Sequence, residues 1–198
     1  HSTLEKIDQN AFELAVDTIL HAKHIYIIGI RSCAPLASFM AFYFTLMFPN
    51  VHLIQTSSSS EIFEQMVRIG KEDVIIGISF PRYSMRTLKA MEFANNRSAK
   101  VITLTDSVHS PMNLYSSCNL IADSDMASIV DSLVAPLSVI NALIVALCMK
   151  KQNEVAKTLE MLEDIWDEYQ VYENDEINYI DDSIKMRYGK VGDAELYE

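Results

Sequence analysis

The sequence predicts an α/β fold, a doubly wound three-layer sandwich around a five-stranded parallel sheet. Short runs rich in β-branched apolar residues alternate with longer segments whose apolar residues recur at helical spacing. The predicted strands are apolar on both faces, which is typical of parallel sheets covered by helices on each side. The 198 residues, 49% of them hydrophobic, are enough for one well-buried core.

The predicted elements alternate along the chain. Strands are expected at 24–30, 51–55, 73–79, 100–105 and 118–122. Helices are expected at about 3–22, 34–48, 57–70, 84–95, 127–149 and 151–171. The third helix begins with Ser58 and Glu61, which fit the spacing of a capping box. Right-handed crossovers between successive strands would place helices on both faces of the sheet.

The cysteines and the first residues of the sequence indicate the cellular compartment and whether the sequence is part of a longer protein. Cys33, Cys118 and Cys148 are too few and too scattered for a disulfide framework or a zinc site. We therefore expect reduced thiols and a cytoplasmic protein. The sequence begins at His1 without a signal peptide, and we expect it to be a fragment of a longer protein.

Negative charge is concentrated at the carboxyl end. Residues 1–150 contain 13 acidic and 11 basic residues, whereas residues 151–198 contain 14 and 5. No basic stripe for nucleic acid is present, so this chain alone is not expected to bind DNA. We predict one domain over 1–171 and an acidic tail over 172–198. That tail is either solvated or packs its tyrosines on a partner subunit.

One long uncharged segment, 132–149, has the length of a membrane span. Ser132, Pro136, Ser138 and Asn141 interrupt it, and its flanks differ from those of a stop-transfer segment. We interpret it as a core or subunit-interface helix rather than as a membrane span. Its apolar surface predicts a homo-oligomer, either a dimer or a tetramer.

Polar side chains follow four consecutive predicted strands. The richest of these stretches is SFPRYSMRT, residues 79–87, and hydroxyl groups also follow the strands that end near 30, 55 and 105. In an open parallel sheet, ligands bind beyond the carboxyl ends of the strands. Hydroxyl groups, helix N-termini and arginine side chains can together bind a phosphate group. We therefore predict a site for a small phosphorylated molecule.

Serine and threonine are also ordinary N-cap residues, so each strand-end hydroxyl has a purely structural interpretation. The stretch 79–87 is longer and more polar than a cap requires, which favours a binding site there. Arg86 and Lys89 are also explained as solvated residues on a helix surface.

The architecture and the segment ISFPRYSMRT resemble the sugar isomerase (SIS) domain, specifically the effector-binding domain of RpiR-type bacterial transcriptional regulators. Against the general SIS loop S-x-S-G-x-T, Ser79 and Ser84 match the first serine and the threonine, while Pro81 and Arg82 replace a serine and a glycine. Against the first loop, G-x-G-x-S, Gly29 matches the first glycine, Arg31 replaces the second glycine and Cys33 occupies the serine position. Thr105-Asp106, Ser110-Pro111 and the helix at 131–144 extend the resemblance over residues 5–170.

This resemblance implies a flavodoxin-like sensor domain without a cofactor. RpiR-type regulators join an N-terminal helix-turn-helix domain, absent from this chain, to an SIS domain that binds a phosphosugar and shifts DNA affinity. DNA would be bound only through that other domain. The implied phosphosugar contacts are Ser32, Cys33, Ser79, Arg82 and Ser84, with Ser57 to Ser59, Ser58 among them, and Thr105 as second choices.

Two alternatives stay open. SIS domains also include phosphosugar isomerases, which need a general base and an acid, and Glu61 and His109 are the plausible pair near the strand ends. Glu61 is equally explained as a capping residue and His109 as a loop residue. The other alternative is an oligomerisation platform without a ligand. His21 and His24 lack companion ligands, so no metal site is proposed.

Overall fold

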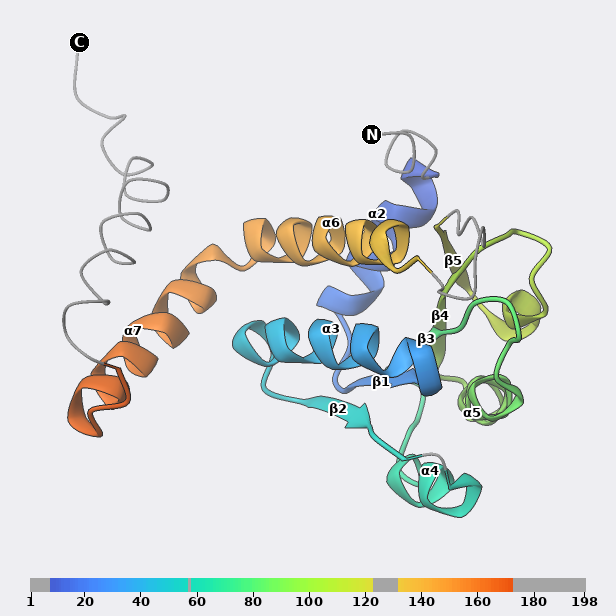
Figure 1. The fold of residues 1–198 in the computed structure, drawn as a ribbon, viewed down its shortest axis with the longest axis horizontal. Coiled ribbons are helices and arrows are strands. Elements are labelled where there is room, and N and C mark those ends of the chain that lie inside the picture. Colours follow the sequence, from blue (N-terminus) through green and yellow to red (C-terminus); the bar gives the residue numbers. More distant parts are fainter. Residues whose placement is uncertain (1–7, 57, 123–131, 173–198) are drawn as a thin grey trace, which may run out of the picture. The chain divides into compact units, whose positions relative to one another are not determined.

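Five parallel strands form one sheet in the order β2-β1-β3-β4-β5, which confirms the predicted fold class (Figure 1). The computed structural model describes residues 8–56, 58–122 and 132–172. The strands are β1 (Ile25–Gly29), β2 (Val51–Ile54), β3 (Val74–Ile78), β4 (Lys100–Thr105) and β5 (Cys118–Ile121). In the parallel register, Gly29 of β1 lies opposite Ile78 of β3. The ends of these two central strands therefore reach the same edge of the sheet.

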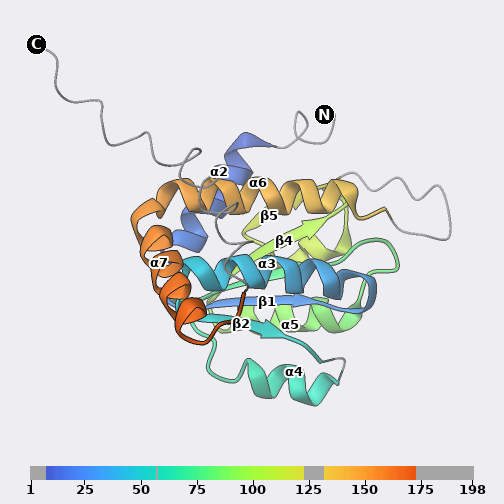
Figure 2. The ribbon, with the colours of Figure 1, turned by 60° about the vertical axis from the view of Figure 1, so that its left-hand side comes forward.

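Helices cover both faces of the sheet. Figure 2 shows α2 (Gln9–Leu20), α3 (Ala34–Met47) and α6 (Val134–Lys150) on one face, and α4 (Ser59–Gln65) and α5 (Met85–Asn96) on the other. Two short 3-10 helices, η1 (Arg31–Cys33) and η2 (Pro111–Tyr115), follow β1 and β4. The last helix is α7 (Gln152–Glu168). This layered arrangement is the doubly wound sandwich expected from the sequence.

Local sequence explains where several helices begin. The Asp8 carboxylate accepts hydrogen bonds from the backbone N–H groups of Asn10 and Ala11, so α2 starts after it. Ser84 caps α5 in the same way, its hydroxyl accepting from the N–H of Thr87. The capping box predicted for α4 is wrong, because Ser58 forms no side-chain cap bond and the Glu61 carboxylate instead accepts from the Thr56 hydroxyl.

Some predicted boundaries differ from the structure. Helix α4 ends at Gln65 rather than near residue 70, because the chain turns there and the Asp73 carboxylate accepts from the N–H of Gly70 at 2.8 Å. The predicted helix parts at 3–7 and 127–131 and the hydroxyl at 57 lie outside the described residues. The same is true of the acidic tail beyond residue 172.

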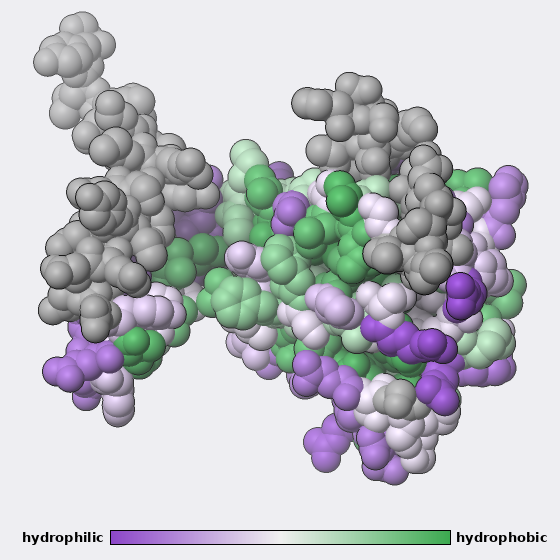
Figure 3. Space-filling view, viewed as in Figure 1, coloured by the Kyte–Doolittle hydropathy of each residue, from purple (hydrophilic) through white to green (hydrophobic). Residues whose placement is uncertain are grey.

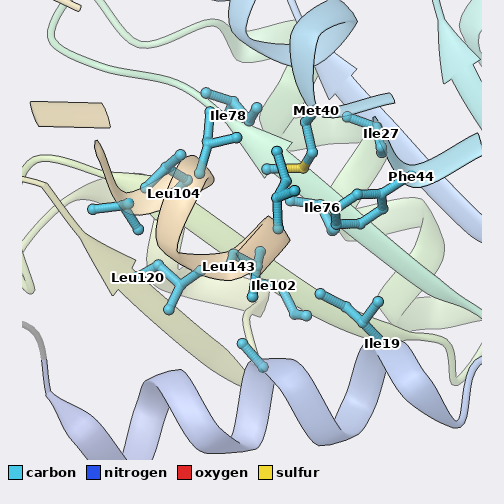
Figure 4. Packing of buried hydrophobic residues seen from close by; sticks show 14 of the residues in the cluster. Ile19, Ile27, Met40, Phe44, Ile76, Ile78, Ile102, Leu104, Leu120 and Leu143 are labelled. Carbon is cyan, nitrogen blue, oxygen red and sulfur yellow. The ribbon is translucent and has the colours of Figure 1, made fainter. Parts of the chain in front are cut away.

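Two hydrophobic clusters lie on opposite faces of the sheet. The larger joins α2, α3 and α6 to the sheet, and Figure 4 shows Ile19, Phe44 and Leu143 converging on strand residues such as Ile76. The smaller cluster joins α4 and α5 to the other face through residues such as Ile62 and Met91. Burying one such side chain contributes about 1.5–3 kcal/mol. These clusters hold the strand ends in place.

Helix α6 is buried on one side only. Val139, Leu143 and Leu147 face the core, whereas Val134 and Val145 are 72% and 57% exposed. Among the described residues no single helix is long and apolar enough to cross a membrane, and only α6 and α7 taken together reach the required length. The chain divides into two compact units, His1–Val155 and Ala156–Glu198. The first unit contains the sheet and both clusters.

Candidate functional site

The carboxyl edge of β1 and β3 is the point where the chain reverses its winding direction. From β1 it continues into α3 on one face of the sheet, and from β3 into α5 on the other face (Figure 2). The two loops diverge there, and in open α/β sheets such a switch point is where ligands bind. The predicted site residues that follow these two strands therefore share one edge.

The loop after β3 is closed by its own serines. Ser79 is only 3% exposed, and its hydroxyl accepts a hydrogen bond of 3.0 Å from the backbone N–H of Ser84. The Ser84 hydroxyl in turn accepts from the N–H of Thr87 at 3.3 Å. A serine hydroxyl can still donate its own proton while it accepts. Neither hydroxyl donates to another residue in the described ranges, so both can donate to an anion.

Arg31 and Arg82 share an unusual backbone conformation. Their φ angles are 60° and 63°, in the left-handed region that favours glycine. In the resemblance described above, both stand where the SIS loop patterns have a glycine that this chain lacks. An L-residue in this region costs about 1–2 kcal/mol, and strained residues of this kind cluster at functional sites. Within the part of the chain described, neither guanidinium group forms a hydrogen bond or an ion pair.

A polar network ties the loop after β3 to the loop after β4. The Tyr83 hydroxyl donates to the Asp106 carboxylate at 2.8 Å, and the Thr105 hydroxyl lies 3.1 Å from the same oxygen and 2.9 Å from the Ser110 hydroxyl. Burial and the bond to Asp106 raise the pKa of Tyr83. Thr105 is completely buried, so it supports this network instead of facing the edge. The network fixes the residue next to Arg82.

Tyr83 and Asp106 were not among the predicted site residues. Tyr83 lies inside the FPRYS segment and Asp106 directly follows a predicted strand, and these positions were the signal available in the sequence. The pairing joins loops 23 residues apart in the chain. Only the sheet order, which makes β3 and β4 neighbours, brings the two side chains together.

The loop after β1 packs tightly. A Cβ atom at Gly29 would lie 2.5 Å from the Cys33 carbonyl oxygen, so only glycine fits at this turn. The Cys33 side chain is 6% exposed and belongs to the larger hydrophobic cluster. Ser32 is exposed. Of the two residues predicted here, Ser32 is therefore the one accessible to a ligand at this edge.

A cleft of about 470 Å³ lies beyond the ends of β1 and β2. Its walls comprise backbone and side chains of Gly29, Ile30, Arg31, Ala34, Ser38, Leu53, Ile54, Gln55 and Thr56. Ser58 donates its backbone N–H to the Thr56 hydroxyl at 3.0 Å and shares a 3.0 Å hydroxyl contact with Ser60. Ser58 therefore supports the rim of the cleft, while Arg31 contributes its cationic wall.

The structure separates Glu61 from His109. Glu61 follows β2 and bonds to Thr56, whereas His109 is an exposed residue of the loop after β4. Strands β1 and β3 lie between β2 and β4 in the sheet. Because neighbouring strands are about 4.8 Å apart, three spacings, roughly 14 Å in total, separate the ends of β2 and β4 that these two residues follow. Across the described residues, no group of three His, Cys, Asp or Glu side chains could hold a metal ion.

Comparison with known proteins places this chain in one family, the SIS domain family. The family model described as the SIS domain matches residues 18–146. A curated relative, an uncharacterized HTH-type transcriptional regulator of Caldanaerobacter subterraneus, is 25% identical over 165 residues. That match covers 80% of this chain and 57% of the relative, so the chain spans little more than half of the relative's length.

Two solved structures share the fold closely. The sugar isomerase domain of an RpiR transcription factor from Sphaerobacter thermophilus has a TM-score of 0.78 at 23% identity, covering 82% of this chain and 90% of that one. The NanR protein of Vibrio vulnificus, solved with ManNAc-6P, has a TM-score of 0.73 at 18% identity, covering 83% and 64%. Other structures with this fold are described as putative phosphosugar isomerases.

Proposed function

We propose that this chain, which belongs to the SIS domain family, is the sensor domain of an RpiR-type transcriptional regulator and binds a sugar phosphate at the carboxyl ends of β1 and β3. The similarity to an HTH-type regulator and to the RpiR and NanR structures supports this assignment. In such a regulator the DNA-binding segment is separate from the sensor, and both act in the cytoplasm.

The main support for phosphate binding comes from the loop after β3. It presents the hydroxyls of Ser79 and Ser84, each with a proton to donate, next to Arg82, whose guanidinium has no partner among the described residues. The Tyr83–Asp106 bond holds this loop in place before any ligand arrives. A phosphate group would accept from the two hydroxyls and from the guanidinium, and these charge-assisted bonds are about twice as strong as neutral ones.

The proposed assembly is a homo-oligomer, a dimer or a tetramer. Helix α6 exposes Val134, Val145 and Met149, and α3 exposes Phe42, which is 62% accessible. Figure 3 shows hydrophobic side chains over α6 on this face. Large apolar surface of this kind marks an interaction site. A second copy would cover it through a self-complementary contact.

The proposed mechanism is a shift between two arrangements of the subunits. Sugar phosphate binding after β1 and β3 would favour one arrangement and thereby the spacing of the attached DNA-binding segments. Such a switch requires the ligand to bind the two states with different affinities. Equal affinity of the effector for the DNA-bound and DNA-free full-length protein, measured by calorimetry, would refute it.

An isomerase is the second candidate, favoured by the isomerase names among structures of the same fold. It would depend on Glu61 and His109, which follow strands separated by two others. A base and an acid acting on adjacent atoms of one sugar need to be closer than three strand spacings. We therefore prefer the sensor.

The test is a thermal-shift screen of this chain against sugar phosphates, each paired with its unphosphorylated sugar. A ligand at a hundred times its Kd stabilises by about 2.7 kcal/mol, which raises the midpoint of a domain of this size by roughly 5–10 °C. The proposal predicts a shift with a phosphate ester and none with the parent sugar. A screen in which no ester shifts the midpoint would contradict it and favour the platform without a ligand.

A further inference from the structure

The cleft beyond β1 and β2 has a cationic side chain, Arg31, in its wall. The phosphate site proposed after β3 already includes a different arginine, Arg82. Arg31 lines the cleft together with Ser38, Gln55 and Thr56, whereas none of Ser79, Arg82 and Ser84 does. Within the described residues the Arg31 guanidinium has no acidic partner. The cleft therefore offers an anion a place distinct from the loop after β3.

We propose that Arg31 binds a second anionic group of the ligand, so that the effector is a sugar phosphate with a carboxylate or another phosphate at its far end. This inference rests on the proposed function, because it takes the first phosphate to be held after β3. The planar guanidinium fork matches the two oxygens of either anion.

The distances within the sheet allow one ligand to reach both places. Strand β1 lies between β2 and β3, so Arg31 follows the strand next to the phosphate loop. Neighbouring strands are about 4.8 Å apart. A ligand anchored after β3 therefore needs to extend over only one to two strand spacings to occupy the cleft.

The rest of the cleft orients such a ligand. Thr56 donates its hydroxyl proton to the Glu61 carboxylate at the rim. That carboxylate repels an anion but can accept from a sugar hydroxyl. The side chains of Ser38 and Gln55 supply further polar partners. The anionic end of the ligand is thus directed to Arg31, and its hydroxyl groups to the β2 side.

The test is isothermal titration calorimetry with two matched pairs of compounds, D-gluconate 6-phosphate with D-glucitol 6-phosphate, and D-ribonate 5-phosphate with D-ribitol 5-phosphate. Each pair differs only in a terminal carboxylate. D-fructose 1,6-bisphosphate and D-fructose 6-phosphate form a third pair that tests a second phosphate instead. The variant is Arg31→Gly, which suits the backbone conformation at φ 60° and should fold. Ser98→Gly, at φ 64° on the exposed surface, is the matched control.

In the unaltered chain we expect the member with the second anionic group, a carboxylate or a second phosphate, to bind about ten- to a hundred-fold more tightly than its partner in at least one pair. Arg31→Gly should abolish this preference without weakening the partner that lacks the second anionic group, and Ser98→Gly should retain the preference. Equal affinity within every pair overturns the inference and leaves the proposed function intact. Equal weakening of both partners by Arg31→Gly also overturns it, because Arg31 would then hold the first phosphate. Failure of every compound to bind overturns the inference and the proposed function together.

Discussion

The buried hydroxyl of Ser79 accepts a 3.0 Å hydrogen bond from the backbone N–H of Ser84, which joins the end of β3 to the N-cap of α5. This bond spans the loop in which Arg82 adopts its left-handed conformation. The loop is therefore ordered by contacts within the protein. Such preorganisation lowers the entropy that a ligand must lose on binding.

Removing the Ser79 hydroxyl should weaken both the fold and the site. In Ser79→Ala the N–H of Ser84 loses its acceptor in a partly buried position, which costs about 1–2 kcal/mol. We expect this loss in urea unfolding, together with weaker binding of whichever ester the screen identifies. The exposed Ser60→Ala is the control and should unfold as the unaltered chain does. Identical unfolding of Ser79→Ala and Ser60→Ala would contradict a role for this bond.

Replacing Arg82 by glycine should separate stability from binding. Glycine suits φ 63°, so Arg82→Gly is expected to unfold with a free energy equal to that of the unaltered chain or up to about 1 kcal/mol higher. Its affinity for the phosphate ester should fall at least ten-fold because the guanidinium is lost. Ser98→Gly removes the same kind of strain elsewhere and should leave binding unchanged. A stable Arg82→Gly variant that binds normally would exclude Arg82 from the site.

Thr87 offers a test of polar burial near the site. Its hydroxyl is completely buried and has no hydrogen-bond partner among the described residues. Thr87→Val replaces the hydroxyl by a methyl group of similar shape, so we expect stability to be unchanged or to rise by about 1 kcal/mol. Thr103→Val should instead destabilise, because the Thr103 hydroxyl lies 2.8 Å from the Asn113 amide oxygen. Equal losses in the two variants, measured by urea unfolding, would contradict this account.

The fold followed from the sequence more fully than the site did. Apolar β-branched runs such as VIIGI predicted β3, and the alternation of strands with helices predicted the sandwich, because burial on both faces leaves a local pattern. The serines and arginines at the strand ends were likewise visible. Whether such a polar group faces the edge or the core was not visible, since the Cys33 thiol and the Thr105 hydroxyl are placed by packing between distant segments. The cleft beyond β1 and β2 likewise depends on which strands are neighbours.

The histidines at the other end of the sheet predict a pH dependence of stability. His24 Nδ1 and His52 Nε2 lie 3.1 Å apart, and His52 stacks on Tyr26. Burial and then the neighbouring His24 lower the pKa of His52, while Asp73 acts in the opposite direction. The pKa of His52 in the unfolded chain is the ordinary 6.5, so below pH 6.5 the unfolded chain binds a proton that the folded chain does not yet bind. The free energy of unfolding therefore falls as the pH drops from about 6.5 through the lower pKa of folded His52.

We expect the thermal midpoint of the unaltered chain to decrease as the pH is lowered from 7 to 5. The midpoint of His52→Asn should decrease less steeply over the same range. His21→Asn is the control, because His21 is exposed and its imidazole contacts only Asp17 among the described residues. Parallel slopes for His52→Asn and the unaltered chain would show that the pair does not contribute.

If the exposed apolar side of α6 forms the contact between subunits, a charge placed there should disrupt the homo-oligomer. Val145→Glu places a charge on the apolar surface proposed to face a second copy, so the variant should be monomeric in light scattering while its circular dichroism is unchanged. Leu114→Glu, on a residue that is 69% exposed in η2, is the control and should assemble normally. An assembly unchanged by Val145→Glu would place the interface elsewhere.

The most direct test of the central claim is an NMR titration of the 15N-labelled chain with inorganic phosphate, compared with chloride at equal ionic strength. If the loop after β3 binds a phosphate group, the amide signals of residues 79–87 should shift in a saturable manner with phosphate and not with chloride. Arg82→Gly should weaken that response. Saturable shifts confined to another part of the chain, or none at all, would contradict the claim that Ser79, Arg82 and Ser84 form the phosphate site.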